Sequence, residues 1–232
     1  MSLDRRTVLK GMAIGGIAAP MLGAALPALA NGMTGAASAT DVPVLAVVGT
    51  SSGAAFAQGA RAGLGSLLQV RQAGSDLVRL LRELEKMWHG DRPMRVVGLL
   101  DDASAVPLLD VARSAGTRIA WLGQHSVQAG GSRHRLLTTD RVEGGARELA
   151  RQLRDCGAGF SLTEDRQHSL TPVFQAEALA CGSADPGQWA AAVGLLLART
   201  DARVPAPAPL PHSGRTPHPG SFVSFLIEPE GV

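Results

Sequence analysis

The chain has 232 residues, with 22 Lys and Arg against 20 Asp and Glu, and it contains two cysteines. Residues 1–30 hold three of the basic residues and one acidic residue, so the rest of the chain carries 19 of each sign. Nucleic acids and anionic membrane surfaces both bind clustered positive charge, and a body without excess charge argues against both as partners. The residues after position 30 are enough for one domain with a hydrophobic core.

Residues 1–30 have the pattern of an export signal. A short charged segment comes first and is followed by residues 11–29, which contain no charged side chain. Pro27 ends any helix there, because its ring fixes φ and it has no amide hydrogen to donate. Ala28 and Ala30 then form the small-x-small pattern that signal peptidase reads. We therefore expect cleavage near Ala30.

The charged segment resembles the consensus of twin-arginine signals through the adjacent Arg5 and Arg6. It departs from the consensus at Asp4, where a hydroxyl residue is usual, and at Val8, where phenylalanine is usual. The resemblance implies the twin-arginine translocase as a partner during export and the periplasm as the destination, with no stable membrane insertion. Two alternatives stay open. One is the general secretory route, and the other is a retained anchor, because about 20 apolar residues can span a bilayer.

Strand and helix patterns alternate after residues 31–41, a small polar segment expected to be flexible. Short apolar runs rich in β-branched residues predict strands, and apolar residues at helical spacing predict helices. In chain order, the sequence predicts a strand at 42–48, a helix at 54–68, a helix at 77–88 capped by Ser75 or Asp76, a strand at 95–100, a helix at 103–115, strands at 117–122 and 135–138, a helix opening at Asp140 or Arg141 and ended by Gly157, a strand at 160–163 and a helix at 188–199.

The end of the chain has a different composition. Residues 201–220 are rich in proline and predict an extended tether. Residues 221–232 predict a C-terminal strand, with its apolar part at 221–227. We expect this strand to return to a sheet edge, in this chain or in a partner.

This alternation predicts a single α/β domain at 42–200, a Rossmann-like or flavodoxin-like layer with a mostly parallel central sheet. In such sheets, ligands bind beyond the carboxyl ends of the strands. The predicted ligand-binding residues at those ends are Thr50, Ser51, Ser52, Asp101, Asp102, Gln124, His125 and Asp140. For Asp101 and Asp102 a second role stays open, because acidic residues at this position often cap the following helix.

Three segments resemble the N-terminal lobe of type I periplasmic binding proteins: Val96–Leu100, Gly116–Ala120 and Thr138–Ala146. They lie within residues 42–155, and their order along the chain is that of the family. The resemblance implies a protein that binds a small molecule. The chain departs from the family because only residues 156–232 follow, which are too few for a second lobe, so we expect no two-lobed clamp.

Residues 49–53 read Gly-Thr-Ser-Ser-Gly and fit the G-x-S-x-G nucleophile elbow. In that motif a strand-to-helix turn exposes a serine hydroxyl near a base and two amide donors, which makes Ser51 a candidate nucleophile. Its partners would be an acid from Asp101, Asp102 or Asp140 and a histidine from His212 or His218. Alternatively, the turn holds an anion on its free amides or merely caps the helix.

Cys156 and Cys181 either form one disulfide in an oxidising compartment or remain buried thiols. Two cysteines are too few for an iron–sulfur cluster, and no C-x-x-C-H motif for haem is present, so no cofactor is predicted. The six histidines include no i, i+4 pair on a predicted helix, and no metal site is predicted.

These features predict a periplasmic protein that is not an enzyme and binds a small molecule or a partner protein. Two alternatives stay open: a small serine hydrolase using Ser51, and an accessory subunit of a periplasmic redox or transport complex. The twin-arginine resemblance motivates the second alternative, because that route exports folded and often cofactor-loaded proteins.

Overall fold

The computed structural model describes residues 42–49, 51–64, 68–74, 76–90, 94–128, 131–167, 169, 172–181, 187–200 and 219–229. These residues belong to one compact unit, Ala39–Val232. Outside the described residues lie Thr50, the segment 31–41, residues 201–218 of the predicted tether, and the export signal with Arg5, Arg6, Ala28 and Ala30. The interpretations of these segments stay predictions.

In the described part of the chain, eight strands form one mixed sheet that five α-helices accompany. The strands are β1 (Val44–Val48), β2 (Leu68–Gln72), β3 (Arg95–Asp101), β4 (Arg118–Gln128), β5 (Gly131–Thr138), β6 (Phe160–Arg166), β7 (Phe174–Ala178) and β8 (Gly220–Glu228). The helices are α1 (Gly53–Leu64), α2 (Leu77–Trp88), α3 (Asp102–Ser114), α4 (Gly145–Asp155) and α5 (Gln188–Ala198), with a 3₁₀ turn at Asp140–Val142. The order across the sheet is β2-β1-β3-β8-β4-β5-β6-β7.

The α/β class is confirmed, but the prediction of a mostly parallel sheet is wrong. β1 pairs in parallel with β2 and β3, and β5 with β6, whereas the other four neighbouring pairs are antiparallel. Three features cause this: β4 and β5 form a hairpin, β8 enters antiparallel to both of its neighbours, and β7 pairs antiparallel with β6. The predicted helix at 54–68 is also too long, because α1 ends at Leu64 and Leu68 begins β2.

β8 lies in the middle of the sheet, which corrects the predicted edge position. It pairs with β3 on one side and with β4 on the other. All residues from Phe222 to Glu228 are buried, as expected of a strand that is covered on both faces. The sheet is therefore complete only after the last strand of the chain has joined it.

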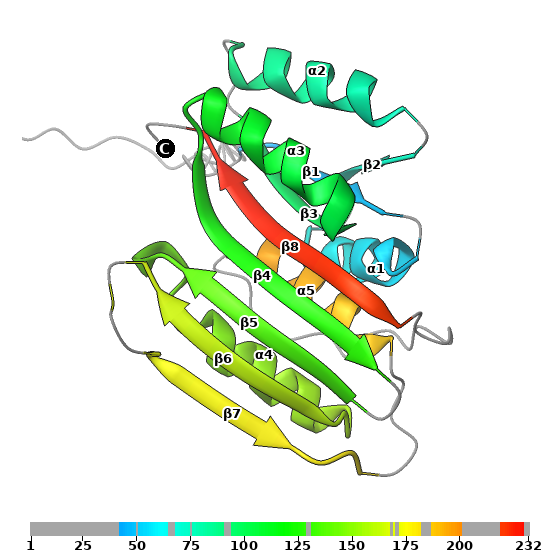
Figure 1. Cartoon of the computed structure of the whole chain (residues 1–232), viewed down its shortest axis with the longest axis vertical. Helices are drawn as coiled ribbons and strands as arrows, with labels where there is room; N and C mark the ends of the chain where they lie inside the picture. The colour runs from blue at the N-terminus through cyan, green and yellow to red at the C-terminus, as the bar shows by residue number, and fades with distance from the viewer. Residues whose placement is uncertain are drawn as a thin grey trace, which may run out of the picture. The chain divides into compact units, whose positions relative to one another are not determined.

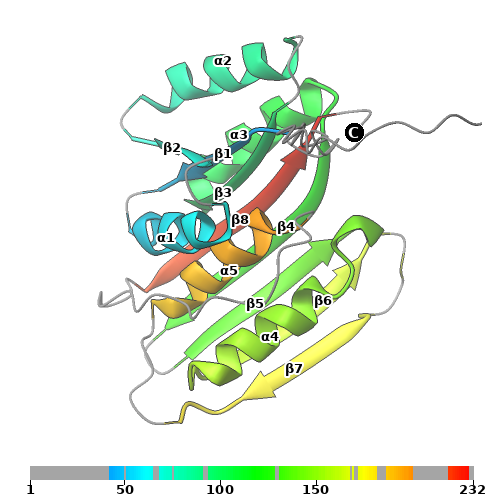
Figure 2. The same cartoon turned by 180° about the vertical axis from the view of Figure 1, so that it is seen from behind.

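Helices cover the two faces of the sheet unequally (Figures 1 and 2). α2 and α3 lie on one face, over β1, β3 and β8, and α1, α5 and α4 lie on the other face. Leu108 and Phe225 belong to the hydrophobic cluster on the α2–α3 side, and Leu149 and Trp189 belong to the cluster on the opposite side. None of the described helices covers the α2–α3 side of β5, β6 and β7 (Figure 1).

The burial pattern of β5 follows from this uneven cover. His134, Leu136 and Thr138 are buried, whereas the alternating Arg133 and Arg135 are exposed. Such alternation is typical of an antiparallel sheet with one face in water. We call the side of β4–β7 that carries Arg133 and Arg135 the open face.

α1 and α5 touch each other at two glycines, on the face of the sheet opposite α2 and α3. A Cβ added to Gly59 would collide with the carbonyl oxygen of Ala191, and one added to Gly194 would collide with that of Phe56. Glycine lowers the intrinsic stability of a helix, and here the close contact of two helix backbones requires it.

Candidate functional site

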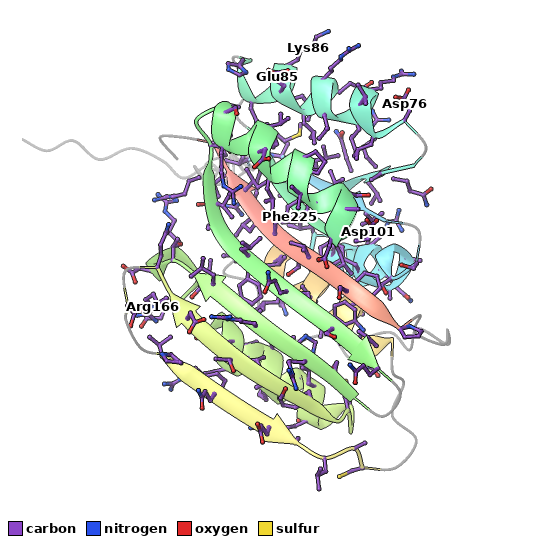
Figure 3. The ribbon with its side chains drawn as sticks, in the orientation of Figure 1. Asp76, Glu85, Lys86, Asp101, Arg166 and Phe225 are labelled. Atoms are coloured by element: carbon purple, nitrogen blue, oxygen red, sulfur yellow. The ribbon has the colours of Figure 1, made fainter. Side chains whose placement is uncertain are left out.

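The predicted ligand-binding residues do not form one ring of loops. Ser51, Ser52 and Asp101 follow or end β1 and β3, which run in the same direction. β5 runs the opposite way, because the pairs β3–β8, β8–β4 and β4–β5 are all antiparallel, and Asp140 follows β5 at the other end of the sheet. Figure 3 shows this separation through Asp101 and Arg166, whose guanidinium lies 3.7 Å from the carboxylate of Asp140.

Asp101 caps helix α3, so its alternative role is confirmed. The amide N–H of Ser104 donates to Oδ1 of Asp101 and the Ser104 hydroxyl to Oδ2, each at 3.0 Å.

Ser51 is exposed, and no described side chain forms a hydrogen bond with its hydroxyl. His212 and His218 lie outside the described residues, so the serine hydrolase stays a prediction.

A groove of about 470 Å³ lies where α3 ends its cover of the sheet and the open face begins. We call it the α3 groove. It is lined by Asp102, Ala105, Val106 and Leu109 of α3, by Leu122, Gln124, His125 and Ser126 of β4, by Arg133 and Arg135 of β5, and by Ser221, Phe222 and Val223 of β8. The structure therefore brings together three of the predicted residues, Asp102, Gln124 and His125.

Strand register explains the polar side of the groove. Ser126 pairs with Ser221 on β8 and with Arg133 on β5, and paired residues point to the same face of a sheet. Gln124 pairs with Arg135 in the next row on that face. The sequence predicts that its strand ends at 122, but β4 continues to Gln128, so Gln124 and His125 lie within a strand instead of after it.

The two arginines of the groove differ in their partners. The Nε of Arg135 donates to the Asp165 carboxylate at 3.1 Å, which neutralises that position. Arg133 is exposed and forms no hydrogen bond or ion pair with any described side chain. Its guanidinium therefore remains available to an anionic group of a ligand.

His125 points its side chain away from the groove, into the core on the α5 side. Its Nδ1 lies 2.7 Å from Nδ1 of His134, and its Nε2 lies 2.7 Å from the Ser224 hydroxyl. Trp121 Nε1 donates to the same hydroxyl at 2.9 Å, and Nε2 of His134 lies 2.8 Å from the Ser132 hydroxyl. We call these five residues the histidine relay. The prediction that His125 contacts a ligand directly is not supported by this orientation.

Burial keeps both histidines of the relay neutral. It lowers the pKa of His134 to about 3, and it lowers the pKa of His125 well below its ordinary value, to which the neighbouring His134 also contributes. The ring of Trp189 covers the pair, with its centroid 4.9 Å from that of His125. Gly123 leaves the space for the contacts, because a Cβ there would lie 2.5 Å from Ser224 Oγ and 2.8 Å from His125 Nε2.

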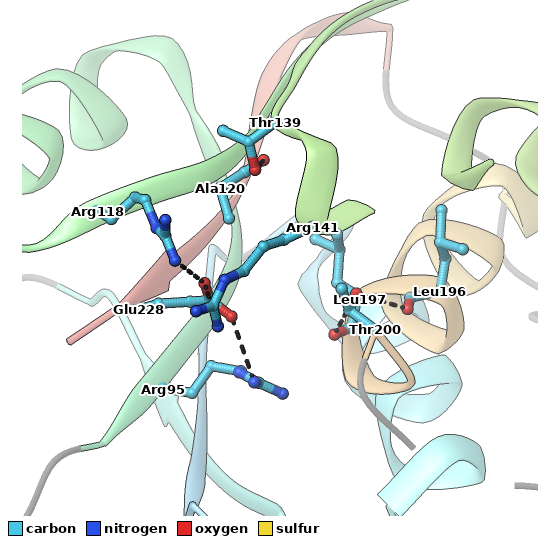
Figure 4. A network of polar contacts seen from close by, with 9 residues as sticks. All are labelled: Arg95, Arg118, Ala120, Thr139, Arg141, Leu196, Leu197, Thr200 and Glu228. Atoms are coloured by element: carbon cyan, nitrogen blue, oxygen red, sulfur yellow. Dashed lines mark hydrogen bonds and ion pairs between the residues drawn. The ribbon is translucent and has the colours of Figure 1, made fainter. Parts of the chain in front are cut away.

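A second polar cluster holds the carboxyl end of β8 (Figure 4). The carboxylate of Glu228 is buried and lies 3.3 Å from Arg95, 3.7 Å from Arg118 and 3.8 Å from Arg141. Burial lowers the pKa of Arg95, and Glu228 opposes that shift. The cluster ties the last strand to β3, β4 and the turn after β5. No local sequence pattern predicts it, because its members are far apart in the chain.

A second hollow, of about 330 Å³, lies at the hairpin end of β4 and β5, beside the start of β6. We call it the hairpin hollow. It is lined by Ser126, Gln128, Gly131, Ser132, Arg133, Gly159, Phe160, Ser161, Ala178, Leu179 and Ala180. Because Ser126 and Arg133 line both hollows, the two are neighbouring parts of one surface.

Cys156 and Cys181 are not joined by a disulfide, and Cys181 is exposed, which differs from the alternative of two buried thiols.

The described ranges contain no group of three or more His, Cys, Asp and Glu side chains that could hold a metal ion. The described helices all fall short of the length and hydrophobicity that crossing a membrane requires.

The chain matches no protein-family model, no curated protein and no solved structure. Its resemblance to the lobe of periplasmic binding proteins therefore stays a prediction.

Proposed function

We propose that this chain is an exported periplasmic protein that binds a small molecule in the α3 groove without converting it. The observation that carries the proposal is the exposed Arg133 guanidinium, which has no partner among the described residues and lines an existing groove. Arginine is the side chain best suited to bind carboxylate or phosphate groups, because its planar donors can pair with two oxygens at once. The ligand therefore carries an anionic group.

The opposite wall of the groove supports an apolar part in the same ligand. Val106 of α3 is 59% exposed and lines the groove together with Leu109 and Leu122. Exposed apolar side chains gain free energy when a ligand removes them from water. The volume of about 470 Å³ also lies within the range of about 300–1,000 Å³ that is usual for small-molecule sites.

The compartment is proposed from the sequence of the first thirty residues. Adjacent arginines, an uncharged stretch and the small-x-small pattern around Ala30 support export and cleavage. Recovery of the protein from the periplasm with an N-terminus near Asn31 is the expected outcome. A full-length chain in the membrane fraction would contradict the proposed compartment.

Thermal unfolding in the presence of a library of carboxylated and phosphorylated small molecules tests the binding function. A ligand at a hundred times its Kd stabilises the folded state by about 2.7 kcal/mol, which a shift in Tm detects. We expect Arg133→Ala to weaken such a ligand by about tenfold or more, because a charge-assisted hydrogen bond is lost. The matched control is Arg82→Ala, which removes an exposed arginine from α2. Equal weakening by both variants, or silence across the library, would sink the proposal.

A further inference from the structure

Two side chains of opposite charge line the α3 groove without pairing with each other. They are Asp102, the first residue of α3, and Arg133 of β5, and both are exposed. Neither side chain forms a hydrogen bond or an ion pair with any described residue. The other charged side chain of the groove, that of Arg135, is neutralised by Asp165. Binding sites match the charges of their ligands, so a groove with one available charge of each sign suits a ligand that carries both.

The strand order sets the distance between the two charges. Asp102 follows the last residue of β3, at the level of Ser221 on β8. Ser221 pairs with Ser126 of β4, which pairs with Arg133 of β5. Neighbouring strands lie about 4.8 Å apart, so the backbones of β3 and β5 are about 14 Å apart, with β8 and β4 between them. The ligand groups that bind Asp102 and Arg133 are therefore well separated from each other.

The surface between the two charges offers both polar and apolar contacts. Gln124 and Ser126 lie on the open face of β4, and their side chains form no hydrogen bond with any described residue. An amide and a hydroxyl can each donate and accept, which suits the N–H and C=O of a peptide group. Val106, Leu109 and Leu122 supply an apolar surface beside them.

We propose that the ligand of the α3 groove is a short apolar peptide with free termini, whose ammonium group binds Asp102 and whose terminal carboxylate binds Arg133. The two charges of a free α-amino acid are attached to one carbon, whereas each further residue separates them by up to about 3.3–3.6 Å. A peptide therefore matches the separated charges of the groove better than a single amino acid does. The inference rests on the proposed function, because it names the class of the anionic ligand.

Calorimetric titration of the full chain with leucyl-leucine and three analogues is the first test. N-acetyl-leucyl-leucine lacks the positive charge, leucyl-leucinamide lacks the negative charge, and leucine brings the two charges together. We expect each analogue to bind at least about tenfold more weakly than leucyl-leucine, because each loses a charge-assisted hydrogen bond. Equal affinity of leucyl-leucine and its acetylated form would overturn the proposal.

Variants of the two charged residues show which terminus each one binds. Asp102→Asn should weaken leucyl-leucine about tenfold, and acetylation of the peptide should then change its affinity little, because the partner of the ammonium group is already lost. Arg133→Gln should do the same for amidation of the carboxylate. An acetylation effect of equal size in wild type and Asp102→Asn would contradict the assignment of Asp102.

Two further variants separate binding from folding. An acidic residue in the first turn of a helix stabilises that helix, so Asp102→Asn also affects α3. Asp102→Glu keeps the charge and should retain the acetylation effect. Asp110→Asn removes an exposed carboxylate from the same helix outside the groove lining and should leave the affinity for leucyl-leucine unchanged. Equal weakening by Asp102→Asn and Asp110→Asn would overturn the inference.

The two proposals fail in distinguishable ways. If carboxylates without an amino group bind and Arg133→Ala weakens them, but leucyl-leucine binds no better than its acetylated form, only the peptide is wrong. If leucine binds as tightly as leucyl-leucine, the separation of the charges is wrong, which also overturns the peptide. If neither the library nor leucyl-leucine binds, the α3 groove is not a ligand site and both proposals fail.

Discussion

β1 is buried at every residue and β3 at every residue except Asp101, whereas buried and exposed residues alternate along β5. Helices lie on both faces of β1 and β3, and α4 lies on one face of the β5–β6 region (Figures 1 and 2). Strands enclosed on both sides read as continuous apolar runs, and strands with one wet face read as alternating ones. The two halves of the sheet therefore differ in role. The enclosed half, with β1 and β3, stabilises the fold, and the open half, with β5 and β6, carries the hollows.

Truncation of Phe225 should cause the largest loss of stability, and it tests directly whether the enclosed half of the sheet holds the fold together. Phe225 is fully buried on the α2–α3 side of β8, in the same cross-strand row as Leu137, which is 42% exposed on the open face. We expect Phe225→Ala to lower the free energy of unfolding by about 3–5 kcal/mol, because it leaves a cavity. Leu137→Ala is the matched control and should cost less than about 1.5 kcal/mol. Denaturant titrations measure both losses. Similar losses for Phe225→Ala and Leu137→Ala would show that the two ends of this cross-strand row do not differ in burial as described.

Oxidation of the two cysteines should strengthen the open half. The amide N–H of Cys181 donates to the carbonyl of Gly157 at 3.0 Å, which brings the segment after β7 next to Cys156 at the end of α4. We expect a disulfide to form in periplasmic protein and to stabilise the fold by about 3 kcal/mol through loop closure. Intact mass should show the loss of two hydrogens. The loss should be absent in Cys181→Ser, and a fully reduced mass in periplasmic wild type would contradict the prediction.

A methyl group at the crossing of α1 and α5 tests how closely these two helices pack on the face of the sheet opposite α2 and α3. Gly194→Ala places a Cβ against the carbonyl oxygen of Phe56, so one helix must move. We expect overpacking to cost about 1–3 kcal/mol in thermal or denaturant unfolding. Gly74→Ala is the control, because a Cβ there meets no atom within 4 Å. Equal stability of the two variants would mean that the helices are not in backbone contact.

Acid should weaken the fold through the histidine relay. An unfolded histidine has a pKa near 6.5, and the folded His134 has a pKa of about 3, so the unfolded chain binds protons first as pH falls. Stability should therefore be constant above about pH 6.5 and should fall below it, by up to about 1.4 kcal/mol per pH unit for each buried histidine.

His134→Gln should reduce that acid dependence by the share of one histidine. Urea titrations between pH 7 and pH 4 provide the measurement. An identical slope in wild type and His134→Gln would show that this histidine is already accessible to protons in the folded protein.

Local patterns in the sequence were sufficient for the α/β class and for most elements of the enclosed half. The apolar runs at 42–48 and 95–100 became β1 and β3, the helical spacing at 77–88 became α2, and Asp76 caps that helix by accepting from the Arg79 amide. The helix and its cap depend on contacts between near neighbours in the chain, whereas the two strands are recognisable from their local apolar runs although they pair with distant segments. Two of the predicted ligand-binding residues, Asp102 and Gln124, line the α3 groove, and their role in binding stays a prediction.

Tertiary structure alone decided the place of β8, the direction of half the sheet and the histidine relay. An apolar strand pattern states that a segment is buried but does not name its neighbours, so β8 could not be placed between β3 and β4 from its residues. The same insertion reverses the direction of β5 and moves Asp140 to the other end of the sheet. The relay joins His125 to Ser224 across 99 residues of chain, and such a contact exists only after the last strand has paired.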